Sequence, residues 1–452
     1  MPNRPLSRRD VLRASLALGA GAALPTWFVD RTMAADEVNK PVASPNARPR
    51  VLLIGCGGRG KALGREAKPF ADIVAVCDVD AINAADGAAE FGQAKQYHDF
   101  RQALEHPGID AVLNATPDHW HTLVNLATVR RGKDVYSEKP LTLTIDEGKY
   151  LSKAVRKSGR VLQTGSQQRS DPRFLLACEL VRNGRLGKIQ RVDVALPAGR
   201  NEGPHEPMPV PADLDWNFWQ GQAPERPYTK MRCHNTFRFY LEYSGGTLTD
   251  WGAHHNDIAL WALGEDGPAT IDGKKLVENV PNGFTTPAEY LVTFTYPSGV
   301  TQTIRSLTNT MWNGARKPGA PKEPPRDPKQ PPTDTNGVTF FGADGWLFVT
   351  RGRIEASDPA ILKQELPAGA TRLYASTDHR GDFFNACRTR KDPICPVEVG
   401  HRSVSACHLA VLGCRLGRKL TWDPKAEQFV GDDEANKFLS REMRKPWGLE
   451  AV

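Results

Sequence analysis

The sequence predicts an α/β protein with two domains, in which a doubly wound parallel sheet precedes an α+β domain with an open, mainly antiparallel sheet. Three observations support this prediction. The chain has 452 residues, which suits two domains of ordinary size. Apolar strand-like runs alternate with helical patterns as far as about residue 168. Beyond that point strand-like runs follow one another without regular helices, as in antiparallel sheets.

The first domain is expected at residues 49–168, after a polar, proline-containing linker at residues 36–48. Its strands are predicted at residues 50–54, 73–77, 111–115 and 134–137. Helices are predicted between and after them at residues 61–68, 123–131 and 145–157. Because parallel strands are joined by crossover helices, this alternation predicts a parallel sheet with helices on its faces.

The second domain is expected at residues 169–452. It begins with a predicted helix at residues 174–183 and a strand at residues 189–196. Further strands are predicted at residues 290–296, 300–304 and 346–350. The segment 315–336 is rich in proline and lysine, which predicts a surface loop.

The composition is that of a soluble globular protein. Hydrophobic residues make up 40% of the chain and charged residues 25%. The net charge is +7, of which the first 35 residues carry +3, so the remainder is too weakly basic to predict nucleic-acid binding. None of the eight cysteines forms a C-x-x-C pair, which argues against a zinc ribbon or a redox dithiol. No metal site is expected.

The N-terminus has the pattern of an export signal. The pair Arg8-Arg9 precedes an apolar run at residues 14–24, and small residues follow at 32–35. This order is typical of the twin-arginine translocation (Tat) pathway and predicts a signal peptide at residues 1–35 that engages the Tat export machinery. The protein is therefore expected to be periplasmic or otherwise exported. A basic tail and an uncleaved anchor are the alternatives, and the apolar run is too short for a stable membrane span.

A glycine loop follows the first predicted strand. Gly55, Gly57 and Gly60 form a G-x-G-x-x-G pattern between a strand and a helix, which is the context in which this pattern binds a dinucleotide. Gly55 permits the tight turn, Gly57 lets the backbone approach a pyrophosphate, and Gly60 allows close packing of helix on strand. Asp78 ends the second strand and can accept hydrogen bonds from the adenosine ribose. Because no arginine or lysine adjoins Asp78, this Rossmann-type pattern favours NAD over NADP.

Thr116 and Pro117 follow the strand predicted at residues 111–115, on the side of the sheet where ligands bind. Both are therefore expected near the cofactor. His119 and His121 come next along the chain. Loop histidines are often helix caps or packing residues, so a functional role and a structural role both stay open for them.

Lys139 follows the next predicted strand, within the segment Glu138-Lys139-Pro140. A lysine at this position can hold a substrate hydroxyl and favour the alkoxide that forms as hydride leaves. The alternative is a solvated lysine without a role. Pro140 after a charged pair indicates a fixed turn, for which a cis peptide bond is one form.

Asp250 and His254 lie four residues apart in a segment, 245–263, that predicts an amphipathic helix. Residues at i and i+4 share a helix face, and a carboxylate beside an imidazole raises its basicity and orients it. Such a pair suits a proton acceptor for an alcohol. The alternative is a capping aspartate and a partly buried histidine. A metal site is a poorer interpretation, because His255 points about 100° away from His254 and no further ligand is evident.

Together these motifs resemble the glucose–fructose oxidoreductase / inositol dehydrogenase family (Gfo/Idh/MocA). The resemblance covers residues 49–265 well and the rest weakly. It depends on the glycine loop, Ala115-Thr116-Pro117 with His121, Glu138-Lys139-Pro140 and Asp250-x-Gly252-x-His254. In that family the lysine of E-K-P and the aspartate and histidine of D-x-G-x-H are catalytic, which implies catalytic roles for Lys139, Asp250 and His254. The family fold is a Rossmann domain followed by an α/β domain with an open, largely antiparallel sheet.

The motifs and the resemblance also define the expected cofactor site. The residues expected to bind NAD are Gly55, Gly57, Gly58, Arg59, Gly60, Asp78, Thr116, Pro117, His121, Glu138 and Lys139. A homo-oligomer is expected as well. Because the Tat route carries folded protein away from the cytoplasmic NAD pool, the cofactor is expected to be loaded before export and tightly held.

The resemblance implies an NAD(P)-dependent oxidoreductase that transfers hydride from or to a secondary alcohol of a sugar, cyclitol or glycoside. Some exported relatives are NAD-dependent glycosidases, which oxidise, eliminate, hydrate and reduce within one cycle. A non-catalytic sugar-binding relative is the third alternative, against which the intact catalytic residues argue. Trp216, Trp219 and Trp251 either stack on a sugar face or pack in the interior. The sequence leaves the substrate open.

Overall fold

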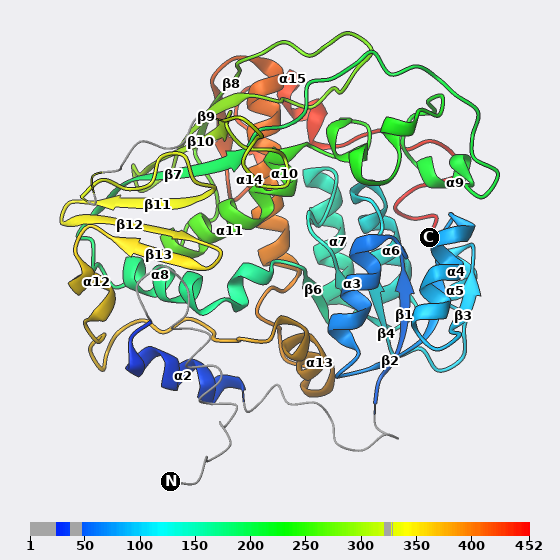
Figure 1. Ribbon diagram of the computed structural model, residues 1–452, viewed down its shortest axis with the longest axis horizontal. Helices are drawn as coiled ribbons and strands as arrows, with labels where there is room; N and C mark the ends of the chain where they lie inside the picture. The colour runs from blue at the N-terminus through cyan, green and yellow to red at the C-terminus, as the bar shows by residue number, and fades with distance from the viewer. Residues whose placement is uncertain (1–23, 37–47, 321–326, 328) are drawn as a thin grey trace.

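Two helix-covered sheets make up the protein, one on the right and one on the left of Figure 1. The computed structural model describes residues 24–36, 48–320, 327 and 329–452. The predicted signal segment as far as residue 23 and residues 37–47 of the predicted linker lie outside this description. No helix within the described ranges is long and apolar enough to cross a membrane.

The first sheet has six parallel strands in the order β3-β2-β1-β4-β5-β6, which confirms the predicted parallel sheet. The strands are β1 (Arg50–Ile54), β2 (Asp72–Cys77), β3 (Lys95–Tyr97), β4 (Ala111–Asn114), β5 (Asp134–Ser137) and β6 (Leu162–Thr164). Sequence analysis missed β3 and β6 because each has only three residues and no extended apolar run. The strand order reverses between β1 and β4, and ligands of doubly wound sheets bind at the carboxyl edge of such a reversal.

The helices of this half are α3 (Gly58–Ala67), α4 (Ala81–Glu90), α5 (Phe100–Ala103), α6 (Asp118–Arg130) and α7 (Ile145–Ser158). Two of them begin earlier than predicted. The first residue of α3 is Gly58 in the glycine loop, and α6 begins directly after Pro117. Both helices therefore direct their N-termini at the carboxyl edge of the sheet, where their positive dipole ends favour an anion.

The second sheet has nine strands in the order β13-β12-β11-β7-β10-β9-β8-β14-β15. They are β7 (Ile189–Pro197), β8 (Thr270–Lys275), β9 (Tyr290–Thr295), β10 (Thr301–Leu307), β11 (Gly337–Gly342), β12 (Gly345–Thr350), β13 (Arg353–Ala356), β14 (Leu420–Asp423) and β15 (Gln428–Phe429). All neighbours are antiparallel except the parallel pair of β7 and β10. The predicted, mainly antiparallel sheet is confirmed.

Three helices cover one face of the second sheet: α8 (Pro172–Arg182), α11 (Gly252–Leu263) and α14 (Val397–Leu416). Shorter helices are α9 (Trp216–Gln220), α10 (Thr247–Asp250), α12 (Pro359–Lys363), α13 (His379–Thr389) and α15 (Asp433–Asn436), with 3-10 helices η3 (Gln167–Ser170), η4 (Lys230–Arg232), η5 (His234–Phe239) and η6 (Lys437–Leu439).

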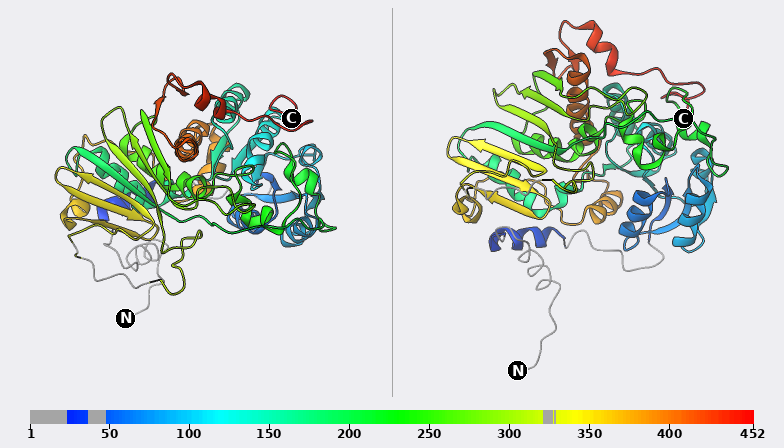
Figure 2. Two further views of the ribbon diagram at one scale, coloured as in Figure 1. Left: turned by 90° about the horizontal axis from the view of Figure 1, so that it is seen from above. Right: turned by 45° about the horizontal axis from the view of Figure 1, so that its top comes forward.

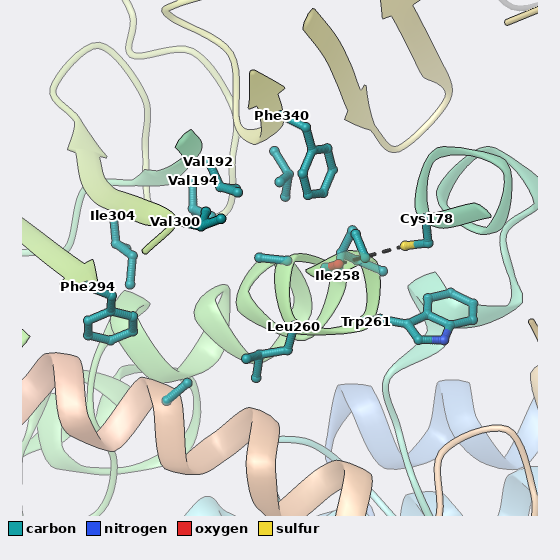
Figure 3. Close-up of a cluster of buried hydrophobic side chains, with 14 of the residues drawn as sticks. Cys178, Val192, Val194, Ile258, Leu260, Trp261, Phe294, Val300, Ile304 and Phe340 are labelled. Atoms are coloured by element: carbon teal, nitrogen blue, oxygen red, sulfur yellow. Dashed lines mark hydrogen bonds between the residues drawn. The ribbon is translucent and has the colours of Figure 1, made fainter. Parts of the chain in front are cut away.

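The core under the second sheet surrounds α11. Figure 3 shows Ile258 and Leu260 of this helix among side chains of the sheet, including Phe294. Every residue of α11 from Gly252 to Ala262 is buried. The prediction of an amphipathic helix was wrong, because α11 lies between the sheet and the neighbouring helices α8 and α14 and has no face towards solvent.

Helix α14 joins the two halves. It contacts β8 and α11 on one side and α7 and β6 of the first half on the other. Small residues allow this approach, since a Cβ on Gly148 of α7 would meet the ring of His401 at 2.1 Å. The C-terminal segment also returns to the first half (Figures 1 and 2). There Trp447 packs against Trp120 with ring centroids 4.8 Å apart.

The helix α2 (Thr26–Asp36) packs near α8, at the lower left of Figure 1. Phe28 is fully buried in the core of the second sheet. Arg31 binds the buried carboxylate of Glu179 at 2.5 Å. The small residues at 32–35, which sequence analysis interpreted as a cleavage site, belong to this helix.

Replacing Phe28 by alanine is expected to destabilise the full-length protein by about 3 kcal/mol, because the substitution leaves a cavity in the core. Thermal or denaturant unfolding of the two proteins measures the difference. The matched control is Thr26→Ala, which changes an exposed residue of the same helix. An unfolding transition that Phe28→Ala leaves unchanged would show that α2 does not contribute to the folded core.

Candidate active site

A cavity of about 790 Å³ lies between the carboxyl edge of the first sheet and segments of the second half. All the residues predicted to bind the cofactor line it, and so does His254. Asp250, the remaining predicted catalytic residue, lies behind Lys139 and does not line the cavity. The volume is within the range of small-molecule sites, roughly 300–1,000 Å³.

The glycine loop has the geometry that a pyrophosphate needs. Gly55 has a φ of +87°, and a Cβ there would meet the backbone of Ala115 at 2.6 Å. A Cβ on Gly60 would lie 1.8 Å from the carbonyl oxygen of Gly55, so helix and strand approach closely only with glycine. Gly57 and Gly58 meet nothing within 4 Å and face the cavity. No side chain caps the N-terminus of α3, so its free N–H groups fit a dinucleotide phosphate.

Asp78 joins the end of β2 to this loop. Its carboxylate accepts hydrogen bonds from the backbone N–H groups of Cys56 at 2.7 Å and Asp80 at 2.9 Å. Burial raises the pKa of Asp78 to about 6, although these two hydrogen bonds act in the opposite direction. Asp78 lines the cavity at the position expected for a ribose-binding carboxylate.

His121 holds two strand ends together. Its ring nitrogens lie 2.6 Å from the carbonyl oxygen of Pro140 and 2.9 Å from that of Thr116. The peptide bond between Lys139 and Pro140 is cis, which is one of the forms open to the turn predicted there. The arrangement fixes the turn that carries Lys139.

Glu138 pairs with the arginine of the glycine loop. Its Oε1 lies 2.7 Å from a guanidinium nitrogen of Arg59, and Glu138 itself is buried. Arg59 also binds Glu66, which in turn binds Arg380. The charges on this side of the cavity therefore compensate one another.

Lys139 and Asp250 form an ion pair across the two halves of the protein. The ammonium of Lys139 donates to Oδ1 of Asp250 at 2.5 Å and to its carbonyl oxygen at 3.0 Å, and both side chains are largely buried. Arg238 approaches the same carboxylate at 3.4 Å. Burial alone would raise the pKa of Asp250, but Lys139 and Arg238 outweigh it and lower the pKa to about 2. The carboxylate therefore stays ionised.

The structure corrects the expected pairing of Asp250 with His254. The carboxylate of Asp250 binds cations instead, and Nδ1 of His254 has no hydrogen-bond partner among the described residues. The helix breaks between the two residues, since α10 ends at Asp250 and the N–H of His254 donates to the carbonyl oxygen of Trp251. Burial, followed by the positive charges of Lys139 and Arg351, lowers the pKa of His254 well below its usual value. Asp250 does not raise the basicity of His254.

The other predicted candidates pack in the interior. His119 is buried against Trp219, and burial lowers its pKa to about 3. Trp216 and Trp219 stack on each other with centroids 4.9 Å apart in a buried aromatic cluster, and only Trp219 reaches the cavity. Trp251 stacks on His255.

Sequence analysis missed several residues of the cavity wall. Gln168 and Asp171 come from the start of the second half, Arg238 from η5, and Arg351 from the turn after β12. None belongs to a motif with fixed spacing. The only sequence signal near them is the pair Asp171-Pro172, which has the composition of a helix N-terminus.

Known protein families match most of the chain. Residues 49–166 match the NAD-binding Rossmann fold of the GFO_IDH_MocA oxidoreductase family. Residues 197–300 and 360–449 match the C-terminal alpha/beta domain of the same family. Residues 5–25 match the signal sequence of the twin-arginine translocation pathway, which identifies an export signal.

Individual relatives agree with this assignment. The chain is 30% identical over 211 residues to scyllo-inositol 2-dehydrogenase (NAD(+)) of Bacillus subtilis (strain 168), covering 47% of this chain and 52% of that protein. It is 32% identical over 208 residues to a glycosyl hydrolase family 109 protein of Saccharopolyspora erythraea, covering 41% of this chain and 45% of that protein. The chain thus spans about half the length of the curated relatives it matches.

Solved structures agree on the fold. The WlbA dehydrogenase of Bordetella pertussis, in complex with NADH and UDP-GlcNAcA, superposes with a TM-score of 0.61 at 18% identity, over 83% of this chain and 99% of that one. The two family models, the strand orders of both sheets and the glycine loop lead to one conclusion. This chain belongs to the Gfo/Idh/MocA oxidoreductase family, with an NAD-binding Rossmann domain and the family's C-terminal α/β domain behind a Tat export signal.

Proposed function

We propose that the protein is an NAD-dependent oxidoreductase that acts on a secondary alcohol of a sugar, cyclitol or glycoside. The observation that carries this proposal is the position of Lys139 and His254 on the wall of the cavity that begins at the glycine loop. A substrate in this cavity would lie between these two side chains and the nicotinamide end of a cofactor bound at the loop. The similarity to an inositol dehydrogenase supports the same substrate class.

Lys139 is proposed to bind the substrate hydroxyl. Asp250 accepts from the lysine ammonium and fixes its position, and the remaining N–H bonds of the ammonium can point to the substrate oxygen. The positive charge stabilises the oxygen as it loses its proton. NAD, when bound, would accept the hydride that leaves the carbon bearing this hydroxyl. Asp250 is thus a positioning residue that acts through Lys139.

His254 is proposed to accept the hydroxyl proton. A base must be deprotonated to act, and the lowered pKa of His254 keeps its imidazole neutral at neutral pH. The same charges that lower this pKa leave the imidazole a weak base. Proton transfer to His254 therefore depends on the alcohol being acidified by Lys139 at the same time.

A second candidate function is glycoside cleavage through transient oxidation. The similarity to a glycosyl hydrolase family 109 protein favours this candidate. It would need the same bound NAD and the same proton acceptor for the oxidation. The new carbonyl acidifies the C–H of the adjacent carbon, and loss of that proton expels the glycosidic oxygen from the carbon beyond it. Addition of water to the resulting double bond and return of the hydride to the carbonyl carbon would complete the cycle. Release of the phenol from an aryl glycoside, without net formation of NADH, would select glycoside cleavage over a dehydrogenase.

Tight retention of the cofactor is part of the proposal. An exported protein has no soluble NAD pool, so a cofactor loaded before export must be reoxidised in place and the reaction must be redox-neutral. The segment 211–240 crosses the adenosine end of the cavity. The carbonyl oxygen of Asp213 accepts from Ala81 N–H at 2.8 Å, Asp215 N–H donates to Val79 O at 3.0 Å, and His234 lies 3.5 Å from Asp80. These contacts join the segment to the residues after β2 beside the cavity, and we expect them to slow the release of a dinucleotide bound there.

Replacing Asp78 by alanine is expected to weaken NAD binding at least about tenfold, because a hydrogen-bonded carboxylate is worth roughly 1.5–3 kcal/mol. The same change is expected to reduce the preference for NAD over NADP. Calorimetry on protein freed of cofactor measures both affinities. Asp72→Ala, at the opposite end of the same strand, is the control. Affinities for both cofactors that do not change in Asp78→Ala would remove Asp78 from the site.

Replacing His254 by alanine is expected to lower kcat roughly a hundredfold or more, as the loss of an acid–base group does. In the unmodified protein, kcat/KM is expected to stay constant as the pH falls from about 8 to 6.5 and to decline only below this range, because the pKa of His254 lies well below 6.5. The control is His255→Asn, a buried neighbour outside the cavity wall. Near-normal turnover of the His254 variant contradicts the assigned role.

The purified protein is expected to retain NAD(H) through dialysis and to turn over a suitable substrate pair without added cofactor. Denaturing the dialysed sample and quantifying the released dinucleotide tests retention, and an assay of the native sample tests turnover. Protein that is purified without bound dinucleotide and consumes free NAD in proportion to product would rule out the redox-neutral cycle.

A further inference from the structure

Arg351 lies on the wall of the same cavity as Lys139 and His254, and the proposed reaction gives it no task. It occupies the turn between β12 and β13, where Gly352 has a φ of +80°. The side chain is exposed, and it belongs to the second half of the molecule. The turn therefore presents a guanidinium from the C-terminal domain to the substrate end of the cavity.

The other cationic arginine and lysine side chains of the described cavity wall already have carboxylate partners. Arg59 binds Glu138 at 2.7 Å, Lys139 and Arg238 bind Asp250, and Arg380 binds Glu66. For Arg351, by contrast, the described residues provide no ion pair and no hydrogen bond to the guanidinium. It thus contributes an uncompensated positive charge to the wall.

Two carboxylates lie near enough to influence Arg351, but each already has a partner. Asp250 is bound by Lys139 and Arg238. Asp171 accepts from the backbone N–H of Arg173 at 2.8 Å and lies 3.6 Å from its guanidinium. Burial lowers the pKa of Arg351 even though both carboxylates act in the opposite direction. The described residues therefore leave this exposed guanidinium without a carboxylate of its own, which favours an anionic ligand.

Trp251 fixes the position of this charge. The guanidinium carbon of Arg351 lies 4.8 Å from the centroid of the Trp251 ring, in a cation–π contact. Trp251 is held in turn by a hydrogen bond from its Nε1 to the carbonyl oxygen of Trp312 at 2.8 Å and by stacking on His255. Trp251 lies between Asp250 and His254 in sequence, so it keeps the guanidinium of Arg351 close to His254, the proposed proton acceptor. The contact with the ring leaves the N–H groups of the guanidinium free to bind a ligand.

A second polar group on the wall also has no partner. Both Oε1 and Nε2 of Gln168 are buried without a hydrogen bond among the described residues, and only 3% of the residue is exposed. Such groups are costly unless a ligand or water satisfies them. Gln168 lines the cavity, so its amide is suited to bind polar groups of the same ligand.

We propose that Arg351 binds an anionic group of the substrate, namely a carboxylate attached to a sugar ring. A planar carboxylate accepts two parallel N–H bonds from a guanidinium, and the free edge of Arg351 provides such a pair of donors. The inference rests on the proposed function and narrows its substrate class from sugars in general to sugar acids. Arg351 is then a specificity-determining residue that discriminates a carboxylate from the hydroxymethyl group of the neutral sugar.

The test compares matched pairs that differ only in this group: D-glucose with D-glucuronate, D-galactose with D-galacturonate, D-mannose with D-mannuronate, and their methyl glycosides. Binding to the NAD-containing protein is measured by calorimetry or by the fluorescence of its tryptophans. Hydride transfer is measured separately from the absorbance of the reduced nicotinamide. At least one acid is expected to bind about tenfold or more tightly than its neutral partner, and added salt is expected to reduce this preference.

Three variants identify the source of the preference. Arg351→Gln is expected to weaken binding of the acid about tenfold or more and to change binding of the neutral sugar by less than about twofold. Arg351→Lys is expected to be intermediate, because it keeps the charge and loses the two-point geometry. Arg353→Gln makes the same change two residues along the hairpin, outside the cavity wall, and is expected to behave like the unmodified protein.

The outcomes separate this inference from the proposed function. If Arg351→Gln weakened binding of the acid and of the neutral sugar equally, Arg351 would only support Trp251, and this result would overturn the inference. So would the absence of any preference for an acid across the pairs. Tight binding of an acid that depends on Arg351, without hydride transfer to any substrate, would support the inference and contradict the proposed reaction. Hydride transfer from neutral sugars, together with acids that bind no more tightly than their neutral partners, would support the proposed reaction and contradict the inference.

Discussion

The ion pair between Lys139 and Asp250 is the interaction on which the candidate site depends. It joins a turn of the Rossmann domain to the break between α10 and α11 in the C-terminal domain. Two largely buried charges are expensive to remove from water, and they persist because the ammonium also donates to a carbonyl oxygen while Arg238 approaches the carboxylate. Loss of Asp250 would leave the ammonium of Lys139 without a carboxylate partner beside the cavity.

This pair also determines the electrostatics of its surroundings. Because the carboxylate of Asp250 is occupied by cations, it is not available to His254, which stays neutral and has no hydrogen-bond partner at Nδ1 among the described residues. Because the ammonium of Lys139 is paired with the carboxylate of Asp250, Arg351 provides the guanidinium of the described cavity wall that has no carboxylate partner. The wall therefore combines a charge-compensated region near the cofactor loop with an uncompensated guanidinium at the substrate end.

The relative position of the two halves is supported well beyond this ion pair. Helix α14 packs on both, with Val404 in the core of the first sheet and Leu409 in that of the second. Trp447 of the C-terminal segment packs against the first half, and the segment 211–240 forms backbone hydrogen bonds with the residues that follow β2. A cavity whose two walls come from different domains needs such a framework, because catalytic groups must keep their spacing to within a fraction of an ångström.

The sequence alone determined those features whose physical cause is local. The glycine loop required Gly55 for its φ of +87° and Gly60 because a Cβ there would collide with the carbonyl oxygen of Gly55, and the alternating strands and helices specified a parallel sheet. Tertiary structure decided which charges meet. Spacing of four residues predicted that the carboxylate of Asp250 would contact His254. Instead the helix breaks between the two residues, and the carboxylate binds a lysine 111 residues away in sequence. In the same way, the burial of α11 on all sides and the place of Arg351 on the cavity wall depend on packing between distant segments, which local pattern does not encode.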